Sequence, residues 1–137
     1  MPKRRVLFLC TGNSARSQMA EGLLREHGGD RFEVQSAGTH PAGLNPLAVE
    51  AMRQIGIDIG HQQSKSLEGY LEQSFDFVIT VCDRAKEACP IFPGATRTLH
   101  WSFDDPVAAL GSEAERLAAF RRVRDEILNR IRLFLAA

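Results

Sequence analysis

The chain has 137 residues, of which 44% are hydrophobic and 25% charged, a balance typical of one globular domain with its own core. Its 17 Lys and Arg residues equal its 17 Asp and Glu residues, so no global charge favours nucleic acid or an acidic membrane as a partner. The sequence has no apolar run of transmembrane length and no apolar signal core. Its 3 cysteines, an odd number, predict a protein of the reducing cytoplasm that keeps its thiols for chemistry.

The first predicted element is a strand that leads directly into a helix. Residues 6–9 form a continuous apolar run, typical of a strand buried on both faces. Apolar residues then recur at helical spacing over residues 16–27, until Gly28 and Gly29 end the helix. The turn between strand and helix, residues 10–17, directs backbone N–H groups and the positive end of the helix dipole at one spot. We call this segment the oxyanion loop, because that geometry binds anions.

The side chains of the oxyanion loop add chemistry to the anion site. Cys10 lies at the strand end, where the positive field favours its thiolate, and the Arg16 guanidinium matches two oxygens of a tetrahedral oxyanion. Ser17 can donate its hydroxyl to the sulfur, while Gly12 and Asn13 tolerate the backbone angles of an anion-binding nest. A Cys-x5-Arg pattern alone is equally typical of a buried cysteine beside a surface arginine, but the strand–loop–helix context favours the oxyanion site. The predicted oxyanion-binding residues are Thr11, Gly12, Asn13, Ser14, Ala15, Arg16 and Ser17.

A strand and two helices are predicted next. Residues 32–34 are typical of a second strand. A helix then starts at Asn45, with Pro46 in its first turn, and continues to Gly56. A short helix is expected through residues 70–71. The residues predicted to line the buried face of the longer helix are Leu47, Ala48, Ala51, Met52 and Ile55.

The second half of the chain predicts two more strands and a long helix. Residues 75–81 form the clearest later strand, which places a cysteine at its end. Residues 83–88 are polar but helix-prone, and Leu99 lies in a fourth predicted strand. Ser112 and Glu115 form a capping box that begins the last helix. The apolar stripe of that helix consists of Leu117, Phe120, Ile127, Ile131 and Phe134.

This alternation of strands and helices predicts one α/β domain over residues 1–137 with a parallel sheet. Functional residues of such a sheet gather at the carboxyl ends of its strands. Reactive side chains follow three of the predicted strands: Cys10 the first, Cys82 the third and Asp105 the fourth. If these ends lie together, Cys82 can reach whatever forms on Cys10.

The two later cysteines, Cys82 and Cys89, are close enough in sequence to form a pair. On a helix their spacing places both sulfurs on one face but about 10 Å apart, whereas a disulfide needs Cα atoms within about 7 Å. They can pair only if the segment between them loops out. Only two apolar residues, Ala85 and Ala88, could anchor this segment to a core, so the free-energy cost of opening it is low. A core cysteine beside an uninvolved one fits the residue types equally well. Cys-x6-Cys without a nearby Cys/His pair is poor zinc-ligand spacing, and no metal site is predicted.

Asp105 precedes Pro106, which holds it in an extended or turn conformation. A carboxyl that faces a thiolate and an oxyanion is suited to act as a general acid. The more common role of an aspartate in an Asp-Pro pair is to cap a turn. The sequence leaves both roles open.

Three features together resemble the thioredoxin-coupled arsenate reductases, which share the fold of low-molecular-weight protein tyrosine phosphatases. They are residues 10–22, the Cys82/Cys89 pair, and the segment His-Trp-Ser-Phe-Asp-Asp-Pro at residues 100–106. The resemblance covers essentially the whole chain. The loop alone fits the wider phosphatase superfamily, and the two later cysteines make the match specific. It implies a three-layer α/β fold with a four-stranded parallel sheet flanked by helices.

The resemblance also implies a relay of three thiols. Cys10 attacks arsenate held by the loop and Arg16, while Asp105 protonates the departing oxygen. Cys82 then attacks the Cys10 sulfur, which releases arsenite and leaves a Cys10–Cys82 disulfide. Cys89 then replaces Cys10 as the disulfide partner of Cys82. Thioredoxin reduces the resulting Cys82–Cys89 disulfide with electrons from NADPH through thioredoxin reductase. No bound cofactor is implied.

One position departs from the pattern of this family. Some members bind potassium near the loop with residues that match Asn13, Glu21 and Ser36, plus an aspartate where this chain has Lys65. We expect the Lys65 ammonium to take the place of the cation, close to Glu21. A solvated surface lysine is the equal alternative.

Three functions therefore remain after the sequence analysis. The first is a cytoplasmic, monomeric arsenate reductase for arsenic detoxification, with phosphate or sulfate as competing oxyanions and thioredoxin, glutaredoxin or another thiol as electron donor. The second is a protein tyrosine or aryl phosphatase that uses only Cys10, Arg16 and Asp105 through a cysteinyl-phosphate. The third is a non-enzymatic oxyanion or redox sensor, which needs no general acid. Phosphate and arsenate have similar shape and charge, so the Cys82/Cys89 pair is what discriminates the first two.

Overall fold

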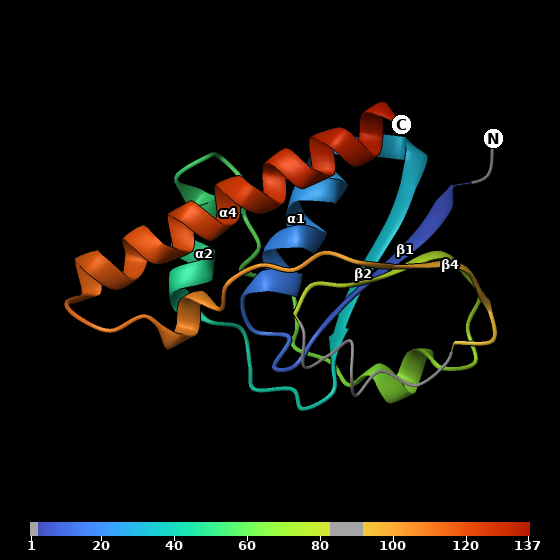
Figure 1. The fold of residues 1–137 in the computed structure, drawn as a ribbon, viewed down its shortest axis with the longest axis horizontal. Helices are drawn as coiled ribbons and strands as arrows, with labels where there is room; N and C mark the ends of the chain where they lie inside the picture. Colours follow the sequence, from blue (N-terminus) through green and yellow to red (C-terminus); the bar gives the residue numbers. More distant parts are fainter. Residues whose placement is uncertain (1–2, 83–91) are drawn as a thin grey trace.

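The computed structural model describes residues 3–82 and 92–137 (Figure 1). Its strands are β1 (Arg4–Cys10), β2 (Phe32–Gly38), β3 (Phe75–Thr80) and β4 (Ala95–His100). Its α-helices are α1 (Arg16–Gly28), α2 (Pro46–Arg53) and α4 (Glu113–Ala136). Short 3-10 helices are η1 (Gly29–Arg31), η2 (Leu67–Tyr70) and η3 (Pro106–Ala108).

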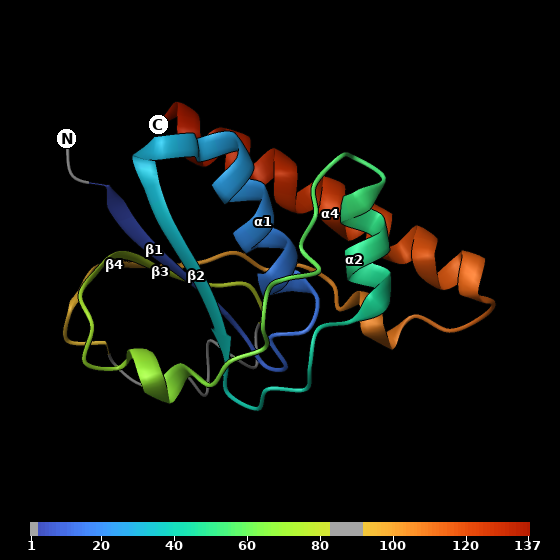
Figure 2. The ribbon, with the colours of Figure 1, turned by 180° about the vertical axis from the view of Figure 1, so that it is seen from behind.

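The four strands form one parallel sheet, as the sequence predicts, and the structure gives their order as β2-β1-β3-β4. Cys10 pairs with Gly38 of β2, and Leu9 pairs with Thr80 of β3. Thr80 in turn pairs with His100 at the end of β4. The carboxyl ends of all four strands therefore lie along one edge of the sheet (Figure 2).

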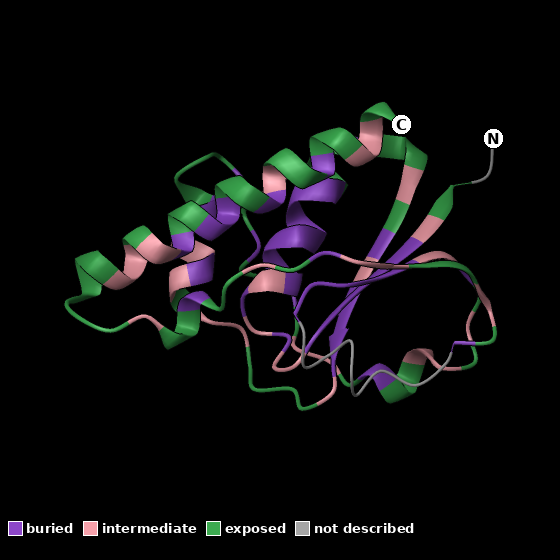
Figure 3. Cartoon of the chain, viewed as in Figure 1, coloured by how far each residue is buried: buried purple, intermediate pink, exposed green. Residues whose placement is uncertain are grey.

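Two apolar cores separate the layers of the fold. Successive side chains of β1 point to opposite faces of the sheet. Val6 and Phe8 lie in a large core beneath α1, α2 and α4. Leu7 and Leu9 lie in a smaller core with Leu67 of η2. Figures 1 and 2 show these three helices on one side of the sheet and η2 on the other. Figure 3 shows buried residues along β1 and α1, which lie between the other elements. The sequence prediction of a strand buried on both faces is confirmed.

The long helix α4 starts and packs as its sequence predicts. The Ser112 hydroxyl accepts a hydrogen bond from the Glu115 backbone, and the Glu115 carboxylate accepts one from the Ser112 N–H, which completes the capping box. Phe120, Ile127 and Ile131 are fully buried against α1 and α2. The ends of the predicted stripe, Leu117 and Phe134, are only partly buried.

The prediction for Ile55 is wrong. The helix α2 ends at Arg53, and Gly56 has a positive φ of 80° that turns the chain. Ile55 is therefore carried off the helix and is 39% exposed, while Ile57 and Ile59 enter the core in its place.

Other differences concern element boundaries. The strand β2 continues to Gly38, beyond the predicted residues 32–34, and η2 ends at Tyr70, before Leu71. The predicted helix over residues 83–88 lies outside the described part of the chain, as does Cys89. Within the described ranges, the helices are too short or too polar to cross a membrane.

Candidate active site

The carboxyl ends of β1, β3 and β4 border a cleft of about 760 Å³. Its lining includes Cys10 and Arg16 from the oxyanion loop, Cys82 after β3, and Asp105 after β4. The structure thus brings together the reactive residues that the sequence places at three separate strand ends.

Cys10 is buried, with 3% of its surface exposed, and two loop groups surround its sulfur. The Ser17 hydroxyl oxygen lies 2.8 Å from the Cys10 Sγ, and the backbone N–H of Asn13 donates to the same sulfur at 3.2 Å. Hydrogen bonds of this kind favour a thiolate over a thiol.

The backbone of the oxyanion loop is oriented by its own carbonyl groups. The backbone N–H groups of the neighbouring segment, residues 39–45, donate to these carbonyls, and a peptide N–H points away from its C=O. The loop N–H groups therefore point away from that segment, and the first turn of α1 adds its positive dipole end to the loop. The carbonyl acceptors are those of Cys10, Thr11, Gly12 and Ser14, and their donors are the N–H groups of Thr39, His40, Ala42 and Asn45.

Gly38 allows β2 to end directly against this loop. A Cβ at Gly38 would lie 2.6 Å from the Thr11 carbonyl oxygen and 3.0 Å from both the Cβ and the backbone N of Asn13. Any larger residue at this position would therefore push the loop out of place. This role of Gly38 was not predicted from the sequence.

Arg16 reaches from the oxyanion loop to the segment after β4. Its Nη1 donates to the Phe103 carbonyl oxygen at 3.0 Å, and its Nη2 lies 3.7 Å from the Asp105 Oδ2. The Asp105 Oδ1 accepts from the Val107 N–H at 3.0 Å, which caps η3. Asp105 thus has the turn-capping position that the sequence left open and also faces the guanidinium of the cleft.

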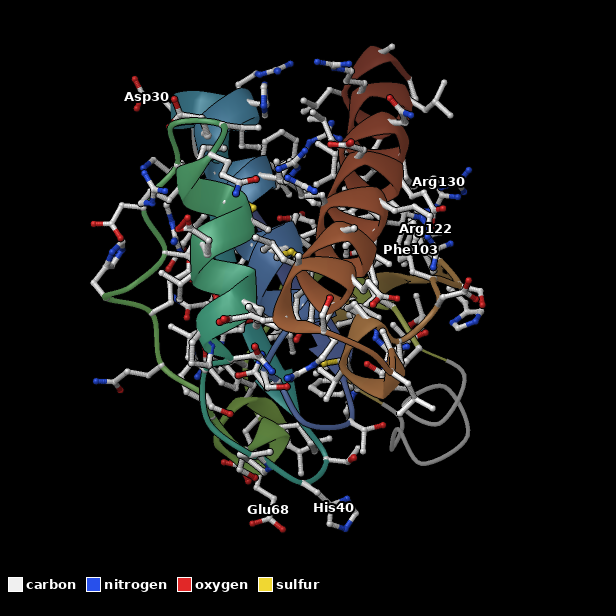
Figure 4. All side chains as sticks on the ribbon, turned by 90° about the vertical axis from the view of Figure 1, so that its left-hand side faces the viewer. Asp30, His40, Glu68, Phe103, Arg122 and Arg130 are labelled. Atoms are coloured by element: carbon white, nitrogen blue, oxygen red, sulfur yellow. The ribbon has the colours of Figure 1, made fainter. Side chains whose placement is uncertain are left out.

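The segment that carries Asp105 is anchored to the helix α4. Trp101 is 4% exposed and packs its ring 5.7 Å from that of Phe134. The Arg130 guanidinium lies 5.4 Å from the centre of the Trp101 ring, and Arg122 pairs with Asp104 at 3.2 Å. Figure 4 shows Phe103, Arg122 and Arg130 on the same side of α4.

Cys82 is 3% exposed and lies at the cleft beside the oxyanion loop. Its Sγ is 3.4 Å from the Thr11 Oγ1, a distance suited to a hydrogen bond with sulfur. The structure thus places Cys10 and Cys82 around one cleft, whereas its described residues do not include Cys89.

Lys65 lies near Glu21, as the sequence analysis expects. Its Nζ is 3.9 Å from the Glu21 Oε1 and donates to the Gln63 carbonyl oxygen at 2.9 Å. The Glu21 side chain is only 4% exposed, and the Ser36 hydroxyl donates to it at 2.6 Å. Arg25 also donates to Glu21, at 2.6 Å, so two cations face this buried carboxylate.

Three further polar residues near the loop were not predicted from the sequence: the buried Gln18 and Gln62, and the partly exposed Arg25. Gln18 is fully buried behind the oxyanion loop, and Gln62 is 8% exposed. A signal for two of them is present, since Gln18, Glu21 and Arg25 recur at helical spacing on α1. Among the residues that the structure describes, no group of three or more His, Cys, Asp or Glu side chains is arranged to hold a metal ion.

Comparisons with known proteins place this fold and site in a family. Residues 5–137 match the family model of the low molecular weight phosphotyrosine protein phosphatase. A relative from Halalkalibacterium halodurans, named arsenate reductase, is 50% identical over 134 residues, which cover 98% of this chain and 96% of the relative.

Solved structures give the same result. One, described as an arsenate reductase in the phosphate binding state, superposes with a TM-score of 0.83 at 31% identity and covers 97% of both chains. The thioredoxin-dependent arsenate reductase of Corynebacterium glutamicum has a TM-score of 0.67 at 31% identity, and the match covers 96% of this chain and 63% of that protein. The chain therefore belongs to the low molecular weight phosphotyrosine protein phosphatase family and is similar, over nearly its whole length, to members named arsenate reductase.

Proposed function

We propose that this protein reduces arsenate to arsenite through a relay of three thiols, and that thioredoxin reduces the final disulfide. The observation that carries the proposal is the position of Cys82, whose thiol lines the same cleft as Cys10 and Arg16. A phosphatase needs one nucleophilic thiol in this cleft, whereas a reductase needs a second thiol to accept the bond from the first. The similarity to arsenate reductases over nearly the whole chain supports the same choice.

In the first step, the loop N–H groups and the Arg16 guanidinium hold the arsenate dianion. The Cys10 thiolate attacks the arsenic atom, so that a sulfur–arsenic bond forms and an arsenic–oxygen bond breaks. The departing oxygen takes a proton from Asp105 and leaves as water. The contacts of Cys10 with Ser17 and Asn13 suit it to this role, because both stabilise a thiolate.

In the second step, the Cys82 thiolate attacks the Cys10 sulfur. A Cys10–Cys82 disulfide forms while the sulfur–arsenic bond breaks, and the electron pair of that bond stays on arsenic. Arsenic(V) is thereby reduced to arsenic(III) and leaves as arsenite, while two thiols are oxidised to one disulfide. The Thr11 hydroxyl, 3.4 Å from the Cys82 Sγ, can donate to the attacking thiolate.

In the third step, the Cys89 thiolate attacks the Cys82 sulfur and releases Cys10 as a thiolate. The resulting Cys82–Cys89 disulfide is reduced by the dithiol of thioredoxin, which is in turn reduced by NADPH through thioredoxin reductase. The thioredoxin dependence of the Corynebacterium glutamicum relative supports this electron donor.

Lys65 is proposed to supply the positive charge beside the oxyanion loop that a bound potassium ion would otherwise provide. Its ammonium faces Glu21, and Ser36 joins that carboxylate to Asn13 of the loop. The Lys65 side chain is 26% exposed, which fits a residue held at the site better than a fully solvated one.

The proposal is tested by arsenate-dependent NADPH oxidation with thioredoxin and thioredoxin reductase. We expect turnover by the wild type and its loss in Cys10→Ser, Cys82→Ser and Cys89→Ser alike. A wild type that hydrolyses an aryl phosphate but does not reduce arsenate, with only Cys10→Ser inactive, would instead establish the phosphatase alternative.

A further inference from the structure

A directed chain of hydrogen bonds reaches the Cys10 sulfur from inside the protein. Its last member is Ser17, whose hydroxyl has one hydrogen to donate. The Ser17 oxygen accepts from the Asn13 Nδ2 at 2.8 Å, so its hydrogen is directed at the Cys10 Sγ, also 2.8 Å away. If the Asn13 amide were turned around, its oxygen would draw the Ser17 hydrogen away from the sulfur. The orientation of Asn13 therefore decides what Cys10 receives.

Gln18 and the backbone of Lys65 together set the orientation of the Asn13 side chain, and the Lys65 N–H donates to the Asn13 Oδ1 at 2.8 Å. The Gln18 Nε2 donates to the Asn13 Oδ1 at 3.1 Å and to the Asn13 carbonyl oxygen at 3.0 Å. It also faces the Gln63 carbonyl oxygen at 2.9 Å. Asn13 has a positive φ of 45°, unusual for a residue with a side chain, and Gln18 bonds it at both the side chain and the backbone.

Gln62 and Arg25 set the orientation of Gln18. The Gln62 Nε2 donates to the Gln18 Oε1 at 2.8 Å, which leaves the Gln18 NH2 to face Asn13. The Arg25 Nη1 donates to the Gln62 Oε1 at 3.0 Å. A guanidinium can only donate, so Gln62 must turn its oxygen to Arg25 and its NH2 to Gln18.

We infer that Gln18 is a positioning residue for the nucleophile Cys10, oriented by Gln62 and Arg25. Donor and acceptor alternate from Arg25 through Gln62, Gln18, Asn13 and Ser17 to the sulfur. Gln18 and Gln62 are buried, so water does not compete freely with the contact between them, whereas Arg25 binds Gln62 from the surface with a side chain that is 43% exposed. The inference rests on the proposed function only in naming Cys10 as the nucleophile.

The test is the pH profile of Cys10 alkylation by iodoacetamide, read by mass spectrometry of the Cys10 peptide in the full chain. Gln18→Glu keeps the size of the side chain but replaces the donor by an acceptor. Gln18→Met removes the donor and adds no acceptor. Gln63→Glu makes the same amide-to-carboxylate change on a neighbouring exposed side chain and controls for charge. The charged or thiol groups that line the cleft with Cys10, namely Arg16, Cys82, Asp104 and Asp105, are unchanged in all three variants.

We expect Gln18→Glu to move the alkylation profile to higher pH by about one unit, or about tenfold in rate below the midpoint, as expected for loss of one hydrogen bond to an ionised group. Gln18→Met is expected to shift it less, and Gln63→Glu to stay within about twofold of wild type. A Gln18→Glu profile that coincides with that of Gln63→Glu, although its melting temperature falls, would overturn the inference and leave Gln18 a structural residue.

If Gln18→Glu does not fold, Gln62→Glu tests the same chain one residue further from Asn13. If the hydrogen-bond chain positions Cys10, Gln62→Glu must move the alkylation profile of Cys10 in the same direction. An unchanged alkylation profile would overturn the inference. Alkylation consumes no arsenate. A protein that shows the expected shifts but no arsenate turnover would therefore refute the proposed function and leave this inference standing.

Discussion

The substitution Gly38→Ala tests how closely β2 must approach the oxyanion loop. The added Cβ would lie 2.6 Å from the Thr11 carbonyl oxygen, where ordinary contact begins at 3.4 Å, so the loop must yield by about 0.8 Å. Gly38 has no positive φ, so the effect comes from contact and not from backbone strain. Overpacking of this kind costs about 1–3 kcal/mol. A displacement near 1 Å at reacting groups lowers turnover by up to about 100-fold.

Gly69→Ala is the matched control, because a Cβ at Gly69 meets no atom within 4 Å in the described structure. Both variants are compared with wild type by thermal unfolding and by thioredoxin-coupled arsenate reduction. We expect Gly38→Ala to lose several degrees in melting temperature and at least about tenfold in turnover, and Gly69→Ala to match wild type. Wild-type turnover and stability in Gly38→Ala would refute the claim that this contact holds the loop.

Three further predictions concern single side chains. Asp105→Asn removes the proposed acid and is expected to lower arsenate turnover by about 100-fold or more in the same assay, and undiminished turnover would exclude a general-acid role. Because the Lys65 ammonium lies beside Glu21, arsenate reduction should proceed equally in potassium and sodium chloride, and clear stimulation by potassium would contradict the role of Lys65. Burial, followed by the negative charge of Glu21, raises the pKa of Tyr70 above its ordinary value of 10.0, against the opposing effect of Arg5. Tyr70 is the single tyrosine of the chain, so absorbance at the phenolate band should titrate with a midpoint above pH 10. The contribution of the Tyr70 phenol to the free energy of unfolding is present below pH 10 and should fall as the pH rises through the folded-state pKa. A midpoint at or below 10 would contradict the burial of this phenol.

The oxyanion loop was predictable because its signals are local. The strand, the turn and the helix that form it are contiguous, and the residue types of Cys10, Gly12 and Arg16 identify an anion site at short range. The parallel sheet followed from the same alternation of strands and helices, and its four strands are as expected. The contacts between the loop and Cys82 follow from that topology, since parallel strands end at one edge.

The support behind the loop was not predictable, because it depends on contacts between distant residues. Gln18 and Gln62 are 44 positions apart, and neither residue type signals that its amide is buried. Ile55 was predicted to be buried because its spacing continues the apolar face of α2, but the turn at Gly56 ends the helix first. The role of Gly38 likewise became visible only when β2 was placed beside the loop.

The most direct test of the central claim is a single turnover without thioredoxin, with arsenite and disulfide-linked peptides measured together. In Cys89→Ser, the relay predicts about one arsenite for each protein molecule and a Cys10–Cys82 disulfide, whereas Cys82→Ser should release none. Equal release of arsenite by Cys82→Ser and Cys89→Ser, or its absence from both, would contradict the transfer from Cys10 to Cys82.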